Sequence, residues 1–187
     1  MKNLSKTMVG LVAVLALGAC SGSSVSAEKF AEEARKVEDH TYTEAVIKYD
    51  LDLDMLIVKD QANGEVKFTY EDGEWTTDST DEHELSLYIY LETNVREFNA
   101  ADAVIEFDDV DPKDLKINYY VNPFKVTLSG NVKDSETGSK TNVKCEYKFD
   151  KYGYATYLYT DINSTLKGLD KKEYTLKMYE KINISYK

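Results

Sequence analysis

The chain has 187 residues, and its 34 acidic and 23 basic residues give a net charge of −11. The length fits one domain or at most two small ones, and an apolar fraction of 42 % with 12 % aromatic residues excludes global disorder. A sequence pI near 4.7 argues against a nucleic-acid partner, because phosphate binding needs a basic surface. Two cysteines are too few for a disulfide framework.

The first twenty residues have the pattern of a secretory signal. Two lysines make the start basic, ten apolar or small residues follow, and a stretch of small residues comes next. The apolar run is too short for a transmembrane helix, which needs about 20 residues. We therefore expect residues 1–19 to be a signal peptide that is removed, residues 20–26 to be a short flexible tether, and residues 27–187 to form a single domain.

The segment Leu17-Gly18-Ala19-Cys20 resembles the lipobox of bacterial lipoproteins. The resemblance implies that the Cys20 sulfur receives a diacylglyceryl group, that the signal peptidase cuts before Cys20, and that the new amine is often acylated. Two or three acyl chains hold a protein stably on a membrane, at about 0.8 kcal/mol per buried methylene. The expected location is the extracytoplasmic face of the cell membrane, with the membrane as a partner through the lipid anchor.

The mature chain would keep 21 basic and 34 acidic residues, a net charge of −13. An acidic domain is repelled by anionic lipid, so we expect the domain to stand off the membrane surface.

The first predicted element of the mature chain is a helix over residues 27–37. Ser26 is the expected N-cap, and apolar residues recur at helical spacing from Ala27 to Val37. So short a helix is marginally stable alone, and we expect it to pack on a sheet.

Period-two alternation predicts strands over most of the remaining chain. The longest alternation runs over residues 45–57, and Asn63-Gly64 and Asp72-Gly73 are predicted turns. Further strands are predicted over residues 66–70, 115–121, 124–132, 141–150, 154–160 and 174–186, and residues 161–172 are predicted to form a loop.

Residues 79–99 are compatible with a strand or a helix. Ser79-Thr80-Asp81-Glu82 has capping-box spacing, and acidic residues crowd the first turn. We favour a second helix over residues 81–99, with one stripe at helical spacing composed of Leu85, Tyr88, Ile89, Val95 and Phe98.

About eight strands, joined mostly by short turns, imply antiparallel neighbours with one covered face. The predicted fold class is α+β, a curved and mainly antiparallel sheet with one or two helices against its concave face. A weak internal similarity relates residues 68–75 to residues 147–154, and both run from aromatic residues through an acidic turn with glycine to another aromatic residue. Hairpin chemistry explains this similarity.

No residue pattern indicates catalysis or a cofactor, and we expect no enzyme activity. His40 and His83 are 43 positions apart and belong to no metal-ligand motif. The chain has no phosphate-binding glycine-rich loop and no Gly-x-Ser-x-Gly motif.

A metal site is not expected either. Asp50, Asp52 and Asp54 share a strand face at a spacing of about 7 Å, which suits a solvated face better than one shared cation. The acidic stretch 106–114 lacks the glycine and the terminal glutamate of an EF-hand loop, and a loose Ca²⁺ site and a turn with a capping aspartate are both open interpretations.

Tyrosine distribution is the remaining unusual feature, because ten of the fifteen tyrosines lie between residues 119 and 187. Tyr120, Tyr157 and Tyr159 fall on strand faces opposite their apolar neighbours. Aromatic residues on an open face indicate a candidate binding surface, and cross-strand tyrosine pairing that stabilises an open sheet is the alternative. Cys145 shares a face with apolar neighbours, which favours a core residue over a nucleophile.

Two functions from different classes fit these observations. The first is a non-catalytic binding module of the cell envelope that recognises a protein or a glycan through its tyrosine-rich sheet. The second is a carrier of a hydrophobic ligand such as a lipid, because the expected architecture resembles the half-barrel of lipoprotein carriers and lipid-transfer lipoproteins. That resemblance is architectural, so it implies no binding residues. An extracytoplasmic solute receptor usually has two lobes and needs a longer chain. An apolar pocket between helix and sheet favours the carrier, and an exposed aromatic patch favours the module.

Overall fold

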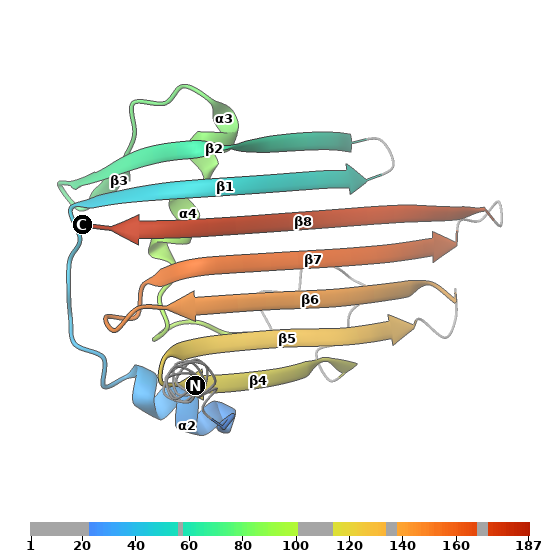
Figure 1. Cartoon of the computed structure of the whole chain (residues 1–187), viewed down its shortest axis with the longest axis horizontal. Helices are drawn as coiled ribbons and strands as arrows, with labels where there is room; N and C mark the ends of the chain where they lie inside the picture. Colours follow the sequence, from blue (N-terminus) through green and yellow to red (C-terminus); the bar gives the residue numbers. More distant parts are fainter. Residues whose placement is uncertain (1–22, 56–57, 101–113, 134–137, 168–171) are drawn as a thin grey trace, which may run out of the picture.

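The computed structural model describes residues 23–55, 58–100, 114–133, 138–167 and 172–187. These residues form one open antiparallel sheet of eight strands with short helices beside it, which confirms the α+β prediction (Figure 1). The helices are α2 (Ala27–Ala34), α3 (Glu82–Ser86) and α4 (Tyr88–Glu92), and the strands are β1 (Glu44–Met55), β2 (Val58–Glu71), β3 (Glu74–Thr76), β4 (Lys116–Val121), β5 (Phe124–Lys133), β6 (Lys140–Phe149), β7 (Ala155–Lys167) and β8 (Glu173–Tyr186).

Strand order across the sheet is β3-β2-β1-β8-β7-β6-β5-β4. Strands β1 to β3 and strands β4 to β8 each pair with their sequence neighbours, as hairpins require. The two groups meet where β1 pairs with β8, so strands from both halves of the chain lie side by side in the middle of the sheet (Figure 1).

One side of the sheet, which we call the inner face, carries the apolar core. Its fully buried side chains include Ile47, Phe68, Val126, Val143 and Ile182, each at most 1 % exposed. The opposite side, the outer face, carries the alternate polar residues of the same strands.

Helices α3 and α4 lie over the inner face of β1 and β8. The Tyr49 hydroxyl donates to Glu84 Oε1 at 3.0 Å, and the Tyr90 hydroxyl donates to Glu180 Oε1 at 3.3 Å. Leu91 on α4 is 1 % exposed, so this short helix is held by burial against the sheet rather than by its length.

Helix α2 packs at the β4 edge of the sheet. The predicted N-cap is confirmed, because Ser26 Oγ accepts from the Lys29 N–H at 3.2 Å. The centroid of the Phe30 ring lies 5.2 Å from that of Tyr119 and 5.7 Å from that of Phe124. Just before the helix, the Val25 N–H donates to the Tyr119 carbonyl at 2.8 Å, so the chain enters the domain along the free edge of β4.

The predicted turn at Asn63-Gly64 is wrong, because both residues lie inside β2. Gly64 pairs with Tyr49 of β1, and a Cβ at Gly64 would lie 2.8 Å from the Tyr49 hydroxyl oxygen. The glycine therefore makes room for a tyrosine on the neighbouring strand, a role that short-range turn statistics do not show. The Asp72-Gly73 turn is confirmed, with φ of 53° and 94° at its two residues.

The predicted loop over residues 161–172 is also wrong in its first half, because β7 continues to Lys167. Ile162 is buried on the inner face, and the Ser164 and Thr141 hydroxyls are hydrogen-bonded at 2.8 Å across the strands. Because the two buried hydroxyl groups are hydrogen-bonded to each other, their burial leaves no polar group without a partner. The polar sequence of this segment can therefore continue as a strand.

Helical structure over 81–99 is confirmed for residues 82–92, but the predicted apolar stripe is wrong. Leu85, Tyr88 and Ile89 are 44 %, 43 % and 49 % exposed, whereas Leu87 and Leu91 are buried. Leu87 both ends α3 and begins α4, and this break shifts the helical phase so that a different set of residues faces the sheet.

Candidate functional site

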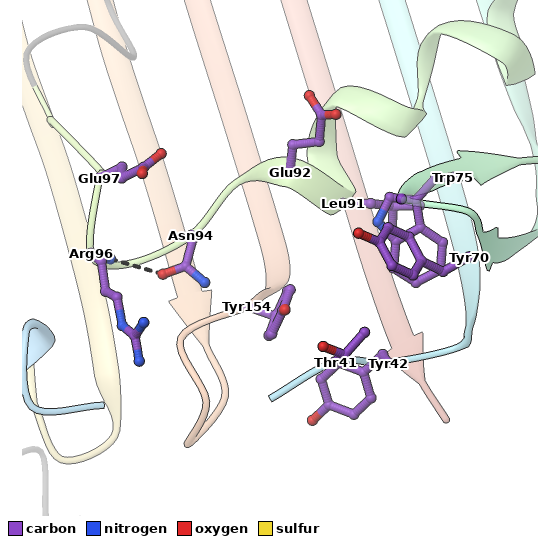
Figure 2. Close-up of a pocket in the computed structure, with 11 residues that line it drawn as sticks. Thr41, Tyr42, Tyr70, Trp75, Leu91, Glu92, Asn94, Arg96, Glu97 and Tyr154 are labelled. Carbon is purple, nitrogen blue, oxygen red and sulfur yellow. Dashed lines mark hydrogen bonds between the residues drawn. The ribbon is translucent and has the colours of Figure 1, made fainter. Parts of the chain in front are cut away.

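A cavity of about 340 Å³ lies on the inner side of the sheet, at the end where β1 begins. Four aromatic side chains line it, Tyr42, Tyr70, Trp75 and Tyr154, and we call it the aromatic pocket (Figure 2). The remaining wall comes from Leu91 and Glu92 on α4 and from the segment 94–97 that follows the helix. Four separate parts of the chain therefore build the pocket, namely residues 41–42, 70–75, 91–97 and Tyr154.

The β2–β3 hairpin positions two of these rings. Its two-residue turn at Asp72-Gly73 has the left-handed backbone that such a tight turn requires. Tyr70 and Trp75 are direct partners across the hairpin, and their ring centroids are 5.1 Å apart. Tyr70 has the same strand parity as Phe68, which places both rings on the inner face.

Hydroxyl groups anchor the other two rings. The Tyr42 hydroxyl donates to Asp150 Oδ2 at 2.6 Å, and the Tyr154 hydroxyl donates to the His40 carbonyl at 2.6 Å. Burial raises the pKa of both phenols above the usual value, and for Tyr42 the Asp150 carboxylate adds to the rise. Both phenols stay neutral donors at physiological pH.

Further aromatic contacts stiffen this end of the sheet. The Tyr42 ring stacks on Tyr186 at a centroid distance of 4.7 Å, and the His40 ring stacks on Tyr152 at 4.0 Å. Offset and edge contacts of this kind add stability beyond buried area. The rings that line the pocket are thus held in fixed positions before any ligand arrives.

The turn between β6 and β7 ties the pocket wall to the sheet. Asp150 Oδ1 accepts from the backbone N–H groups of Tyr152 and Tyr154 at 2.8 and 3.0 Å. Gly153 closes the turn with φ of 85°, and its carbonyl accepts from the Val95 N–H at 2.7 Å. The segment 94–97 is therefore attached directly to this turn.

Charged groups surround the opening of the pocket. The Arg96 guanidinium pairs with the Asp39 carboxylate and also donates to the Val37 carbonyl, and Figure 2 shows it pointing away from Tyr70 and Trp75. The side chains of Glu92 and Glu97 are exposed and make no hydrogen bond or ion pair with the residues that the structure describes.

The pocket therefore combines apolar ring surfaces with two carboxylates that are free to accept hydrogen bonds. The one cation in its wall is already neutralised by a carboxylate. Such a site favours a neutral or cationic ligand with an apolar surface and hydrogen-bond donors, and it disfavours an anion.

A second, more apolar cleft of about 400 Å³ lies between α4 with its following segment and the strands β6 and β7. Ile89 and Phe98 line one side, and Tyr147 and Leu158 line the sheet side. The cleft has the location that the sequence analysis required of a carrier, between helix and sheet.

The predicted tyrosine surface lies on the outer face, on the other side of the sheet from the aromatic pocket. Tyr157 and Tyr159 are on β7 and Tyr120 is on β4. Strands β5 and β6 lie between β4 and β7. The Lys148 ammonium lies 4.4 Å from the Tyr157 ring centroid, and Lys125 lies 4.3 Å from that of Tyr120. The three tyrosines are half-buried among such neighbours.

The other residues named from the sequence are placed as follows. Cys145 is buried on the inner face, and burial raises the pKa of its thiol to about 11. His83 Nε2 lies 3.3 Å from Asp60, and Asp54 pairs with Lys59 at 3.0 Å. Within the described parts of the chain, no three metal-ligating side chains come together. Cys20 and most of the acidic stretch, residues 106–113, lie outside the described residues.

The sequence analysis did not predict the aromatic pocket, although the sequence contains a pattern related to it. The two similar segments, residues 68–75 and 147–154, both end at this pocket and contribute Trp75 and Tyr154 to it. Their similarity was explained by hairpin chemistry alone. That the two hairpins lie at the same end of the sheet depends on strand order, which the repeated pattern does not reveal.

No helix in the described residues is long and apolar enough to span a membrane. Comparisons of the chain with protein-family models, with curated proteins and with solved structures found no match in any of the three.

Proposed function

We propose that the protein is a lipid-anchored, non-catalytic binding protein on the extracytoplasmic face of the cell membrane, and that it holds a sugar unit of a glycan in the aromatic pocket. The observation that carries the proposal is the set of four fixed rings beside two unpaired carboxylates. The lipobox resemblance at Cys20 supports the location.

The choice of a glycan follows from the pocket chemistry. A sugar ring has an apolar C–H surface that packs on aromatic rings, and its hydroxyl groups donate well to carboxylates. Glu92 and Glu97 supply acceptors next to the rings, while Asn94 Oδ1 already accepts from the Arg96 N–H at 3.0 Å, which leaves the Asn94 amide nitrogen as a donor (Figure 2). The fixed rings need little ordering on binding, which reduces the entropic cost.

Trp75 makes the proposal directly measurable, because it is the only tryptophan in the chain and it lines the pocket. The mature polypeptide, residues 20–187, would be titrated with an N-acetylglucosamine tetramer and with a glucose tetramer while Trp75 emission is recorded. The expected result is a saturable change in emission with at least one of the two.

Charge variants test whether the carboxylates take part in binding. Glu92 and Glu97 also line the second cleft, so the ligand is located by the emission of Trp75, which lines the aromatic pocket. Glu97→Gln removes one charged acceptor and should weaken binding about tenfold, as expected for a hydrogen bond to a charged group. Glu82→Gln, an exposed change on α3 away from the pocket, is the matched control and should leave affinity unchanged. No emission change with either saccharide, or equal effects of the two variants, would refute the assignment of the ligand.

The anchor has its own test. Replacing Cys20 by serine removes the acylated sulfur, so the protein should move from the membrane fraction to the soluble fraction. A Cys20→Ser protein that stays equally tightly held in the envelope would refute the lipoprotein assignment, whatever the pocket binds.

The apolar cleft favours a second candidate function, the transport of a hydrophobic ligand. Its lining by Ile89, Phe98 and Leu158 suits an acyl chain. Native mass spectrometry of the mature polypeptide separates the two functions, because a carrier should retain co-purified lipid while the glycan-binding protein should show its bare mass.

A further inference from the structure

The outer face of strands β4 to β8 concentrates lysine. Strands β5 and β6 contribute Lys125, Lys133, Lys140, Lys144 and Lys148, while β4 contributes Lys116 and β8 contributes Lys177 and Lys181; we call this surface the lysine face. Strand register places these eight lysines on one side of the sheet, with Glu146, Asp161 and Glu173 among them, and it places Asp50 and Asp54 of β1 directly across from Lys181 and Lys177. The described side chains of this surface thus carry a net charge of +5 in a chain whose total is −11.

Most of these lysines have no carboxylate partner. Among the described residues, the one ion pair on the lysine face joins Lys148 to Glu146 at 3.1 Å. Lys125 and Lys148 also lie over the rings of Tyr120 and Tyr157. By contrast, each outer-face lysine of β1 and β2 is paired with an acidic residue. The positive charge of the lysine face is therefore available to an external anion.

The net charge of the whole chain does not cancel this local charge. At physiological ionic strength the Debye length is about 8 Å, so charges farther away than this are largely screened. Figure 1 shows α4 behind the strands, with α3 and α2 near the β2 and β4 edges of the sheet. An anionic surface that touches the outer face over β4 to β8 therefore interacts mainly with lysines, whereas the neighbouring part over β1 presents Asp50, Asp52 and Asp54.

Chain geometry brings the lysine face to a membrane. Val25 is hydrogen-bonded to the free edge of β4, which borders the lysine face. Val25 lies five positions after Cys20, and five extended residues span at most about 18 Å. A lipid on Cys20 would thus keep the β4 edge close to the headgroups. Helices α2, α3 and α4 occupy the inner side, so no helix in the described part of the chain covers the outer face.

We propose that the lysine face docks on anionic phospholipid headgroups of the membrane that holds the lipid anchor. The orientation rests on the proposed lipidation of Cys20, but the charge complementarity does not. Tyrosines between the lysines suit this contact, because tyrosine is enriched at membrane–water interfaces. Docking lays the sheet on the bilayer, with the inner face and its aromatic pocket turned away from the membrane.

The test uses the mature polypeptide with Cys20→Ser, so that no lipid contributes to binding. Sedimentation with vesicles of 30 % phosphatidylglycerol in phosphatidylcholine should bring down the protein at 50 mM NaCl, and much less at 500 mM NaCl. Vesicles of phosphatidylcholine alone should not bind it. Because the anchor is absent, this result is independent of whether the Cys20 assignment holds.

Two triple variants separate local charge from net charge. Lys133→Gln, Lys140→Gln and Lys144→Gln together should weaken vesicle binding at least tenfold, since the attraction of each lysine near an anionic surface corresponds to about fivefold. The matched control replaces Lys48, Lys59 and Lys67 by glutamine on the outer face of β1 and β2, which changes the net charge equally and should have little effect.

Three outcomes would overturn the proposal. The first is equal binding to anionic and neutral vesicles, and the second is equal weakening by the two triple variants. The third is binding to soluble polyphosphate without binding to anionic vesicles, which would assign the face to a soluble polyanion. An unchanged urea midpoint for both variants shows that they are folded.

Discussion

Replacing Gly153 with alanine tests how firmly the pocket wall is held. Gly153 has φ of 85°, and an alanine in this left-handed region costs about 1–2 kcal/mol. An added Cβ would also lie 2.7 Å from Val95 Cγ1 and 3.0 Å from Asn94 Oδ1. Overpacking of this kind costs about 1–3 kcal/mol, so the free energy of unfolding should fall by about 2–5 kcal/mol.

Gly73 provides a matched control for the backbone part of this cost. Its φ is 94°, and an added Cβ would have no atom within 4 Å. Gly73→Ala should therefore cost only the backbone penalty of about 1–2 kcal/mol. The difference between the two variants isolates the contact with the segment 94–97, and urea unfolding followed by circular dichroism measures it.

A double variant sharpens the result. Val95→Ala removes the methyl group that meets the new Cβ, so Gly153→Ala should cost less in the Val95→Ala background than in the unmodified chain. If Gly153→Ala and Gly73→Ala destabilise equally, or if the two substitutions at 153 and 95 are simply additive, the close packing of the turn against the pocket wall is refuted.

Three further predictions concern the core, the thiol and the first helix. Leu91→Ala should lower the free energy of unfolding by about 2–5 kcal/mol in urea titrations, while Ile89→Ala on the same helix, 49 % exposed, should cost less than about 1 kcal/mol. Burial raises the pKa of Cys145 to about 11, which leaves about one thiolate per thousand at pH 8, so Ellman's reagent should label no thiol in the folded Cys20→Ser mature protein and one after unfolding in guanidinium. Ser26→Ala removes the N-cap of α2 and should cost about 0.5–2 kcal/mol, and no loss would mean that the cap hydrogen bond is replaced by water.

Strand positions were predictable because the alternation of apolar and polar residues is local. The faces of β1, β6 and β8 follow directly from it, and so does the burial of Cys145. The wrong predictions concern residues whose conformation is determined by contact with a residue far away in the sequence. Gly64 resembles a turn residue but accommodates the Tyr49 ring of the neighbouring strand, and Ser164 resembles a loop residue but is satisfied by Thr141.

The aromatic pocket was not predictable for a related reason. Tyr42 and Tyr154 are far apart in sequence, and they meet only because β1 pairs with β8. Arg96 shows the same limit, since its neutralising partner Asp39 is 57 positions away. The sequence contains the ring types and the turns, but the pairing of strands from the two halves of the chain decides which of them converge.

Net charge was the least informative of the sequence observations, although it supported the expectation that the domain stands off an anionic membrane. The value of −13 for the expected mature chain sums a lysine-rich surface over β4 to β8 with acidic surfaces elsewhere. On the outer face, strand parity gathers lysines on β4 to β8, whereas Asp50, Asp52 and Asp54 project from β1. Strand register therefore decides which charges each part of the outer face presents, and the same register places the aromatic pocket on the opposite side, where a ligand would reach it with the proposed membrane contact in place.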